Sequence, residues 1–142
     1  MFHELVENPG DRSPEELYER YVDELRAAIE TAGIDDVAAE TDVDEETLRA
    51  LVDGDDAEVT LEEAASILAA NDGNRDPDEI ETVSRDALLM GMSMAVLDVE
   101  ALASGIGGEL EPREIQSKAE GRFPMTLREF ALLYQYIESE KR

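Results

Sequence analysis

Three residue types that often carry chemistry are scarce or missing in this chain. It contains no cysteine and no tryptophan, and His3 is its single histidine. The absence of cysteine excludes disulfide bonds and thiolate metal sites. His3 stands in an N-terminal segment with no second ligand at a metal-binding spacing, so we expect neither a catalytic imidazole nor a metal centre there.

Long apolar segments are also missing. The longest apolar run, ALLMGMSMAVL at residues 87–97, is bounded by charged residues, whereas a membrane-spanning helix needs roughly 20 apolar residues. The opening residues MFHELVENPG lack the basic and then apolar pattern of a signal peptide. The sequence therefore predicts a cytoplasmic protein without a membrane partner.

Positively charged side chains are scarce as well. The chain has 12 Lys+Arg against 37 Asp+Glu and a net charge of −25. Such acidity fits disorder, imitation of nucleic acid, or adaptation to a cytosol of molar salt. A hydrophobic content of 42% at helical spacing argues against disorder, and the spread of acids over every predicted helix favours salt adaptation. The charge thus reports habitat more than function.

Segments that alternate apolar and polar residues are absent too, so we expect an all-α fold. Capping boxes, in which a first polar residue and an acid three residues later satisfy each other's backbone N–H groups, open helices at Ser13, Thr60, Asp76 and Thr126. Gly33 ends the first helix, and a loop is expected at 72–76. Helices are predicted at about 14–32, 36–41, 45–52, 61–71, 77–97, 99–104, 112–120 and 127–140.

The helix that contains residues 87–97 is expected to organise the fold. Eleven apolar or small residues in succession leave this part of the helix without a polar face for solvent, so the helix should be buried on most sides. Residues 1–12 show no sustained period and are expected to form a flexible tail. A homodimer through any exposed part of the central helix is compatible with the sequence.

The same order of features occurs twice along the chain. Residues 43–48 and Gly54 match residues 110–115 and Gly121 at an offset of 67. Further matches link Thr60-Leu61 with Thr126-Leu127 at 66, Val37-Ala38 with Leu102-Ala103 at 65, and Leu25 and Ile29 with Met90 and Met94 at 65. We therefore expect one module at 13–76 and a second at 77–142, which share the central helix.

Each module resembles the lambda-repressor-like helix-turn-helix domain. The order of features that carries this resemblance is Leu25 … Val37-Ala38 … Val43 … Leu48 … Gly54 … Leu61, with its counterpart up to Pro124 and Leu127 in the second module. The first module departs from the family by its acids after Gly54, and the second by an insertion at Gly107-Gly108. The chain from about 17 to 140 also resembles an uncharacterised haloarchaeal family described only as a domain of unknown function.

The helix-turn-helix resemblance implies a DNA-reading helix in each module. In the first module the implied positions are Glu45, Glu46, Arg49 and Ala50, an acidic surface that would repel phosphates. In the second they include Pro112, and the implied DNA contacts are Arg113, Gln116, Ser117, Lys118 and Arg122. Residues 109–142 carry six cations and seven acids, so nearly all of the net charge lies before them.

The expected function is that of a small DNA-binding regulator that acts through its second module. The alternative is a protein-interaction adaptor with the same fold, in which Arg113, Lys118 and Arg122 merely pair with acids such as Glu114 and Glu120. We expect no enzyme and no cofactor. The stretch 72–78 begins like a calcium loop but has Pro77 where glycine is needed, and residues 105–108 are too short to hold a phosphate.

Overall fold

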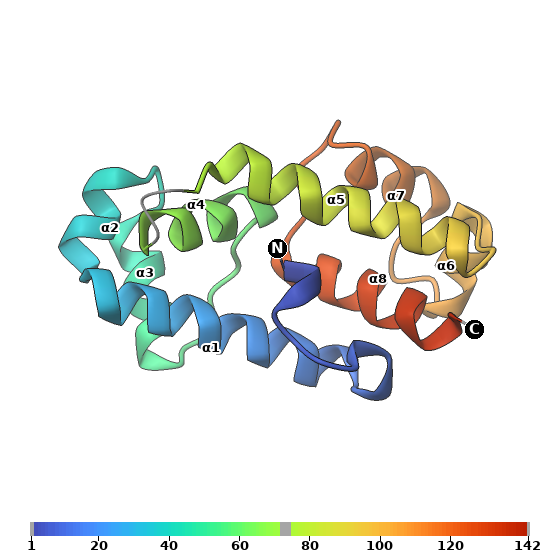
Figure 1. Ribbon diagram of the computed structural model, residues 1–142, viewed down its shortest axis with the longest axis horizontal. Helices are drawn as coiled ribbons and strands as arrows, with labels where there is room; N and C mark the ends of the chain where they lie inside the picture. Colours follow the sequence, from blue (N-terminus) through green and yellow to red (C-terminus); the bar gives the residue numbers. More distant parts are fainter. Residues whose placement is uncertain (1, 72–74, 142) are drawn as a thin grey trace.

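A computed structural model describes residues 2–71 and 75–141, so the predicted loop at 72–76 lies in part outside the described residues. The described residues form eight α-helices and a single isolated β-bridge, which confirms the all-α prediction. The helices are α1 Pro14–Ala32, α2 Ile34–Glu40, α3 Glu45–Asp53, α4 Leu61–Asn71, α5 Pro77–Met94, α6 Val99–Gly105, α7 Pro112–Ala119 and α8 Leu127–Glu140 (Figure 1).

The two ends of the elongated molecule are built from different parts of the chain. Figure 1 shows α2 and α3 at one end and α6 and α7 at the other, with α4 and α8 between them. The long helices α1 and α5 each pack against both α4 and α8. One continuous hydrophobic core therefore joins the first half of the chain (13–76) to the second half (77–142).

Local capping signals position the helix starts as predicted. The capping boxes are present at Ser13/Glu16, Thr60/Glu63 and Thr126/Glu129. At α5 the cap has a different form, because the Asp76 carboxylate accepts the backbone N–H of Asp78 at 3.0 Å rather than that of Glu79. The start of α5 at Pro77 is nevertheless where the sequence places it.

A reciprocal pair of hydrogen bonds joins the starts of α4 and α8. The N–H of Leu61 donates to the carbonyl of Met125 at 2.7 Å, and the N–H of Leu127 donates to the carbonyl of Val59 at 2.9 Å. The two bonds are equivalent in the repeat, because an offset of 66 residues relates Leu61 to Leu127 and Val59 to Met125. Thr60 and Thr126 are thus paired as the one antiparallel bridge among the described residues.

Gly54 and Gly121 occupy like turns, as the repeat predicts. Their φ angles of 79° and 82° lie in the left-handed region that favours glycine. The residue after each glycine donates its N–H five residues back, from Asp55 to Ala50 and from Arg122 to Ser117, both at 2.9 Å. The offset of 67 therefore relates the backbone hydrogen bonds as well as the sequence.

The predicted match of Leu25 and Ile29 with Met90 and Met94 is wrong. Leu25 and Ile29 are fully buried, whereas Met90 and Met94 are 65% and 62% exposed. An offset of 63 instead pairs the caps Ser13 and Asp76, the buried Leu25 and Leu88, and the positive-φ residues Gly33 and Val96. An alignment error of two residues moves the matched position by about 200° around the helix axis, which is enough to exchange the inner and outer faces of the helix.

The central helix is not buried on most sides, contrary to the prediction. Its buried positions, which form one stripe, are Ile80, Ser84, Arg85, Leu88 and Gly91. The outward positions Val83, Leu89, Met90 and Met94 are exposed. The reason is that α4, α7, α8 and the turn at Phe2–Glu4 pack against α5 and cover its buried stripe, while these four side chains stay exposed.

The expectation of a flexible tail at residues 1–12 is also corrected, for the described residues 2–12. This segment forms short 3₁₀ turns at Phe2–Glu4 and Pro9–Asp11. The buried ring of Phe2 lies 5.5 Å from the ring of Tyr21, and its backbone N–H donates to Ser84 Oγ at 3.4 Å. The ring of Phe2 also lies 6.3 Å from that of Phe130, so this segment belongs to the core.

No single helix among the described residues is long and apolar enough to cross a membrane. Only α5 and α6 taken together pass that test by length and composition, and they are bent by 94° at the break between them.

Candidate functional site

Helix α7 presents most of the residues that the sequence singled out. Pro112 occupies its first turn, and a capping box between Glu111 and Glu114 opens it. Ile115 and Ala119 are buried against the core, and α7 contacts α5 and α6. As a result Arg113 and Gln116 are exposed, while Ser117 is half-buried.

Lys118 is held inside the structure rather than presented to solvent. Its side chain is 18% exposed, and Nζ lies 2.6 Å from Glu129 Oε2 and 3.9 Å from Glu114 Oε2. Glu129 also accepts the Thr126 N–H at 2.9 Å in the cap of α8. Lys118 therefore ties α7 to the start of α8.

The other two predicted site cations, Arg113 and Arg122, differ from each other. Arg122 pairs with Glu120 at 2.5 Å, and both side chains are exposed. Exposed ion pairs contribute little free energy, so Arg122 can exchange this partner at small cost. Arg113 forms no ion pair within residues 2–71 and 75–141. Of the three predicted cations, Arg113 is thus the most available for binding.

A pocket of about 460 Å³ lies between α7 and the turn that follows it. Phe123, which is 62% exposed, and Pro124 form its apolar wall. The remaining lining residues are Glu111, Arg113, Glu114, Ser117 and Lys118. The structure therefore brings three of the five predicted site residues to one pocket, and leaves Gln116 and Arg122 outside its lining.

The sequence analysis missed Phe123 and Pro124 as site residues. A signal existed in the repeat, because the offset of 67 places Phe123 where the first half has Asp56. Both side chains are exposed in their turns. The repeat therefore replaces an acidic side chain with an aromatic one at an exposed turn position, which makes Phe123 a candidate site residue.

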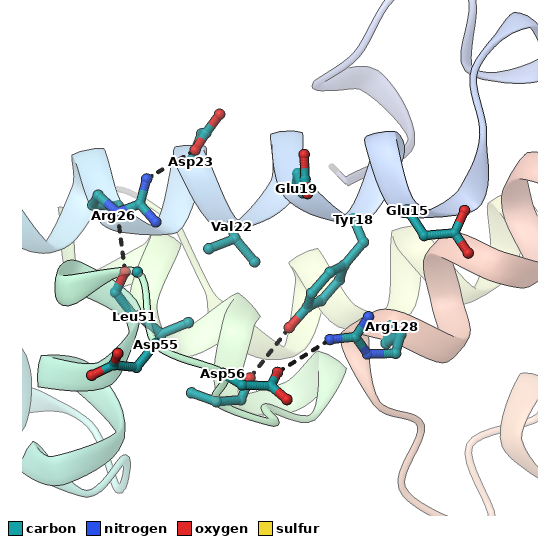
Figure 2. Close-up of a pocket in the computed structure, with 12 residues that line it drawn as sticks. Glu15, Tyr18, Glu19, Val22, Asp23, Arg26, Leu51, Asp55, Asp56 and Arg128 are labelled. Atoms are coloured by element: carbon teal, nitrogen blue, oxygen red, sulfur yellow. Dashed lines mark hydrogen bonds and ion pairs between the residues drawn. The ribbon is translucent and has the colours of Figure 1, made fainter.

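A second pocket of about 430 Å³ lies between α1, the α3–α4 connection and the start of α8 (Figure 2). The Tyr18 hydroxyl donates to the carbonyl of Ala57 at 3.2 Å, and the Arg128 guanidinium lies 4.1 Å from the Tyr18 ring centroid and 3.4 Å from Asp56. Burial raises the pKa of the Tyr18 hydroxyl. These side chains find their hydrogen-bond and ion-pair partners within the protein. We therefore interpret this pocket as a structural contact between α1 and α8 and not as a binding site.

Arg26 strengthens the same region, since its Nε donates to the carbonyl of Leu51 at the end of α3 at 3.0 Å (Figure 2). The carboxylates of Glu15, Glu19, Asp23 and Asp55 make the rest of the pocket acidic. Within the described part of the chain, no group of three or more histidine, aspartate or glutamate side chains could hold a metal ion.

The chain belongs to the family of unknown function DUF5791, whose model matches residues 17–140. The prediction of an uncharacterised domain family is thereby confirmed over the range that the sequence indicated. No curated protein and no solved structure matches the chain. The family description carries no activity, so the function has to be argued from the site.

Proposed function

We propose that this chain, from a family whose function is unknown, is a non-catalytic adaptor that binds a protein partner through α7 and the turn at 121–124. The observation that carries the proposal is the exposed Phe123 beside Pro124 on a pocket of about 460 Å³. Exposed aromatic side chains at the edge of a pocket are typical anchors of protein interfaces. This surface we call the Phe123 face, and it comprises Phe123, Pro124, Arg113 and Ser117.

The chemistry of the Phe123 face indicates what kind of segment it binds. An apolar side chain of the partner would fill the pocket against Phe123 and Pro124. Arg113, which has no ion pair among the described residues, would receive a carboxylate at the rim. A charge-assisted hydrogen bond of this kind adds orientation to the apolar contact. We therefore expect a short partner segment with one bulky apolar and one acidic residue.

The second candidate function is binding of double-stranded DNA, which the exposure of Arg113 and Gln116 at the start of α7 favours. On this hypothesis the second half is a helix-turn-helix module, Arg113 and Gln116 reach base edges, and Ser117, Lys118 and Arg122 approach phosphates. It ranks second because Lys118 would have to leave Glu129, its partner at 2.6 Å. Only Arg113 and Arg122 would remain as accessible cations of α7 and its turn.

For either function we place the protein in the cytoplasm of a cell with molar internal salt. The net charge of −25 supports this setting, because concentrated salt screens repulsion between surface carboxylates. A homodimer is compatible with both functions.

Selection experiments in molar potassium chloride distinguish the two functions. A displayed random-peptide library and a random duplex DNA pool are each selected on the full chain. We expect the peptide library to yield an enriched peptide. Its binding to Phe123→Asp should be weaker by about 2 kcal/mol or more, as is typical for loss of an interface anchor. The substitution installs the residue of the corresponding turn, Asp56, and should leave the fold intact.

The control and the contrary outcomes are equally defined. Arg49→Glu changes α3 at the position that matches Gln116, and it should leave peptide binding unchanged. The contrary outcome is that a duplex is enriched and no peptide is. If Arg113→Glu then weakens binding of that duplex by about 1–3 kcal/mol, the DNA function is established and the adaptor is rejected. If neither library enriches a ligand, both candidates are wrong.

A further inference from the structure

Five large apolar side chains are exposed on α5 or just after it. They are Val83, Leu89, Met90, Met94 and Val96. Val83, Ala87, Met90 and Met94 follow one another at intervals of four, three and four residues, which places them on one line along the helix. We call these four residues the α5 stripe.

The fold itself does not require an apolar α5 stripe. The offset of 63 pairs the four positions with Arg20, Glu24, Ala27 and Thr31 on α1, which are all exposed. On α5 the positions Val83, Met90 and Met94 are exposed, and Ala87 between them is partly buried. Helices α1 and α5 both pack against α4 and α8 from one side. The outer surface of α1 is thus polar and that of α5 is apolar, although the two helices have matching places in the core.

Charge indicates what covers the stripe. Residues 87–97, which hold three of the four stripe positions, contain no charged side chain in a chain whose net charge is −25. The exposed Asp86 lies beside the stripe, one turn from Val83 and from Met90. Two copies of such a chain repel each other at their acidic surfaces, because like charges brought together cost free energy. A basic partner would gain more from the acidic surfaces than from this uncharged one. The stripe is therefore suited to a second copy of the same chain.

The side chains of the stripe are complementary to those of a second stripe that runs in the opposite direction. We propose that two copies associate through the α5 stripe, with the helices antiparallel about a twofold axis between Ala87 and Met90. In this arrangement Val83 faces Met94 of the second copy, and Ala87 faces Met90. A small residue opposite a long, flexible methionine lets the helices approach closely. Closed twofold pairs are the commonest homo-oligomers.

Sedimentation equilibrium of the full chain in molar potassium chloride tests the proposal. We expect a dimer whose Kd rises by at least about tenfold in Met90→Glu, because a carboxylate would enter the apolar contact. Ala27→Glu makes the same change at the matching exposed position of α1 and should leave the Kd unchanged. Added salt should tighten the dimer by screening repulsion, whereas it would weaken contacts made by ion pairs.

Crosslinking tests the contact at the centre of the stripe separately. The chain has no cysteine, so Ala87→Cys provides a unique thiol. A short bismaleimide should join two copies of this variant and should not join two copies of Glu24→Cys, the matching site on α1. A chain that stays monomeric wherever it is folded, or a dimer that Met90→Glu leaves intact, would overturn the proposal. So would a monomer that uses the stripe to bind lipid vesicles. None of these results depends on the Phe123 face.

Discussion

Tyr21 shows at the scale of one residue how the core uses aromatic side chains. It is fully buried, with ring centroids 5.5 Å from Phe2 and 5.9 Å from Phe130. Its hydroxyl has no hydrogen-bond partner among the described residues, and burial raises its pKa strongly above the ordinary value of 10.0. The ring therefore stabilises the core while the hydroxyl opposes folding.

Tyr21→Phe should consequently raise the free energy of unfolding by about 1 kcal/mol, since it removes a buried donor without a partner. The sign of the pH effect follows from the raised pKa. The Tyr21 hydroxyl ionises less readily in the folded state than in the unfolded state. The stability of the folded protein is therefore unaffected by this group below pH 10.0 and falls as the pH rises above that value. The variant should unfold at a higher pH, measured by circular dichroism in constant molar salt.

Tyr18→Phe is the matched control for this prediction. The Tyr18 hydroxyl donates to the carbonyl of Ala57, so its removal should lower the free energy of unfolding by about 0.5–1.5 kcal/mol. If both variants are destabilised equally, the Tyr21 hydroxyl has a partner in solution and the interpretation is wrong.

At the scale of elements, the bridge between Thr60 and Thr126 is the most specific connection between the two halves. The first N–H groups of a helix ordinarily lack backbone partners. Here the N–H groups of Leu61 and Leu127 find carbonyls in the opposite half. The bridge therefore fixes α4 against α8 at the centre of the molecule (Figure 1).

We expect slow amide hydrogen exchange at Leu61 and Leu127, at rates close to those of the buried core of α8. Opening either amide requires separation of the two halves, which share one hydrophobic core. Glu45 and Val99, the first residues of α3 and α6, should exchange much faster. The measurement is exchange by nuclear magnetic resonance in molar salt. Fast exchange at Leu61 would show that the bridge does not persist.

At the scale of the whole molecule, unneutralised negative charge dominates. Most of the cations that form ion pairs are partly exposed, and each such pair contributes little. Lys118 and Arg85 are exceptions among the described residues, because their side chains are only 18% and 10% exposed. The net charge of −25 therefore acts against the compact state unless salt screens it.

Stability should accordingly depend steeply on salt. Lowering the salt from 1 M to 0.1 M lengthens the screening distance from about 3 Å to about 10 Å. Many weak repulsions then add up against a net stability of only about 5–15 kcal/mol. We expect the helical circular dichroism to fall on dialysis to low salt and to return when salt is restored. An unchanged melting temperature over this range would contradict salt adaptation.

The helices of this protein could be predicted because their signals are local. The starts of α1, α4 and α8 depend on hydrogen bonds between residues three apart, and Gly33 ends α1 by its own backbone conformation. Part of the candidate site was equally local, since Arg113 and Gln116 precede and follow the buried Ile115 on one turn of α7. Interactions within one helical turn can be inferred from the order of residues alone.

The remaining features depend on contacts between distant segments. Phe2 meets Ser84 across 82 positions, and Lys118 meets Glu129 on another helix. Composition showed that α5 is apolar, but its covered face depends on where α4 and α8 lie. The exposure of Phe123 likewise depends on how its turn lies on the folded chain. A run of apolar residues has the same composition on a covered face and on an open one, so burial is a property of the packed chain.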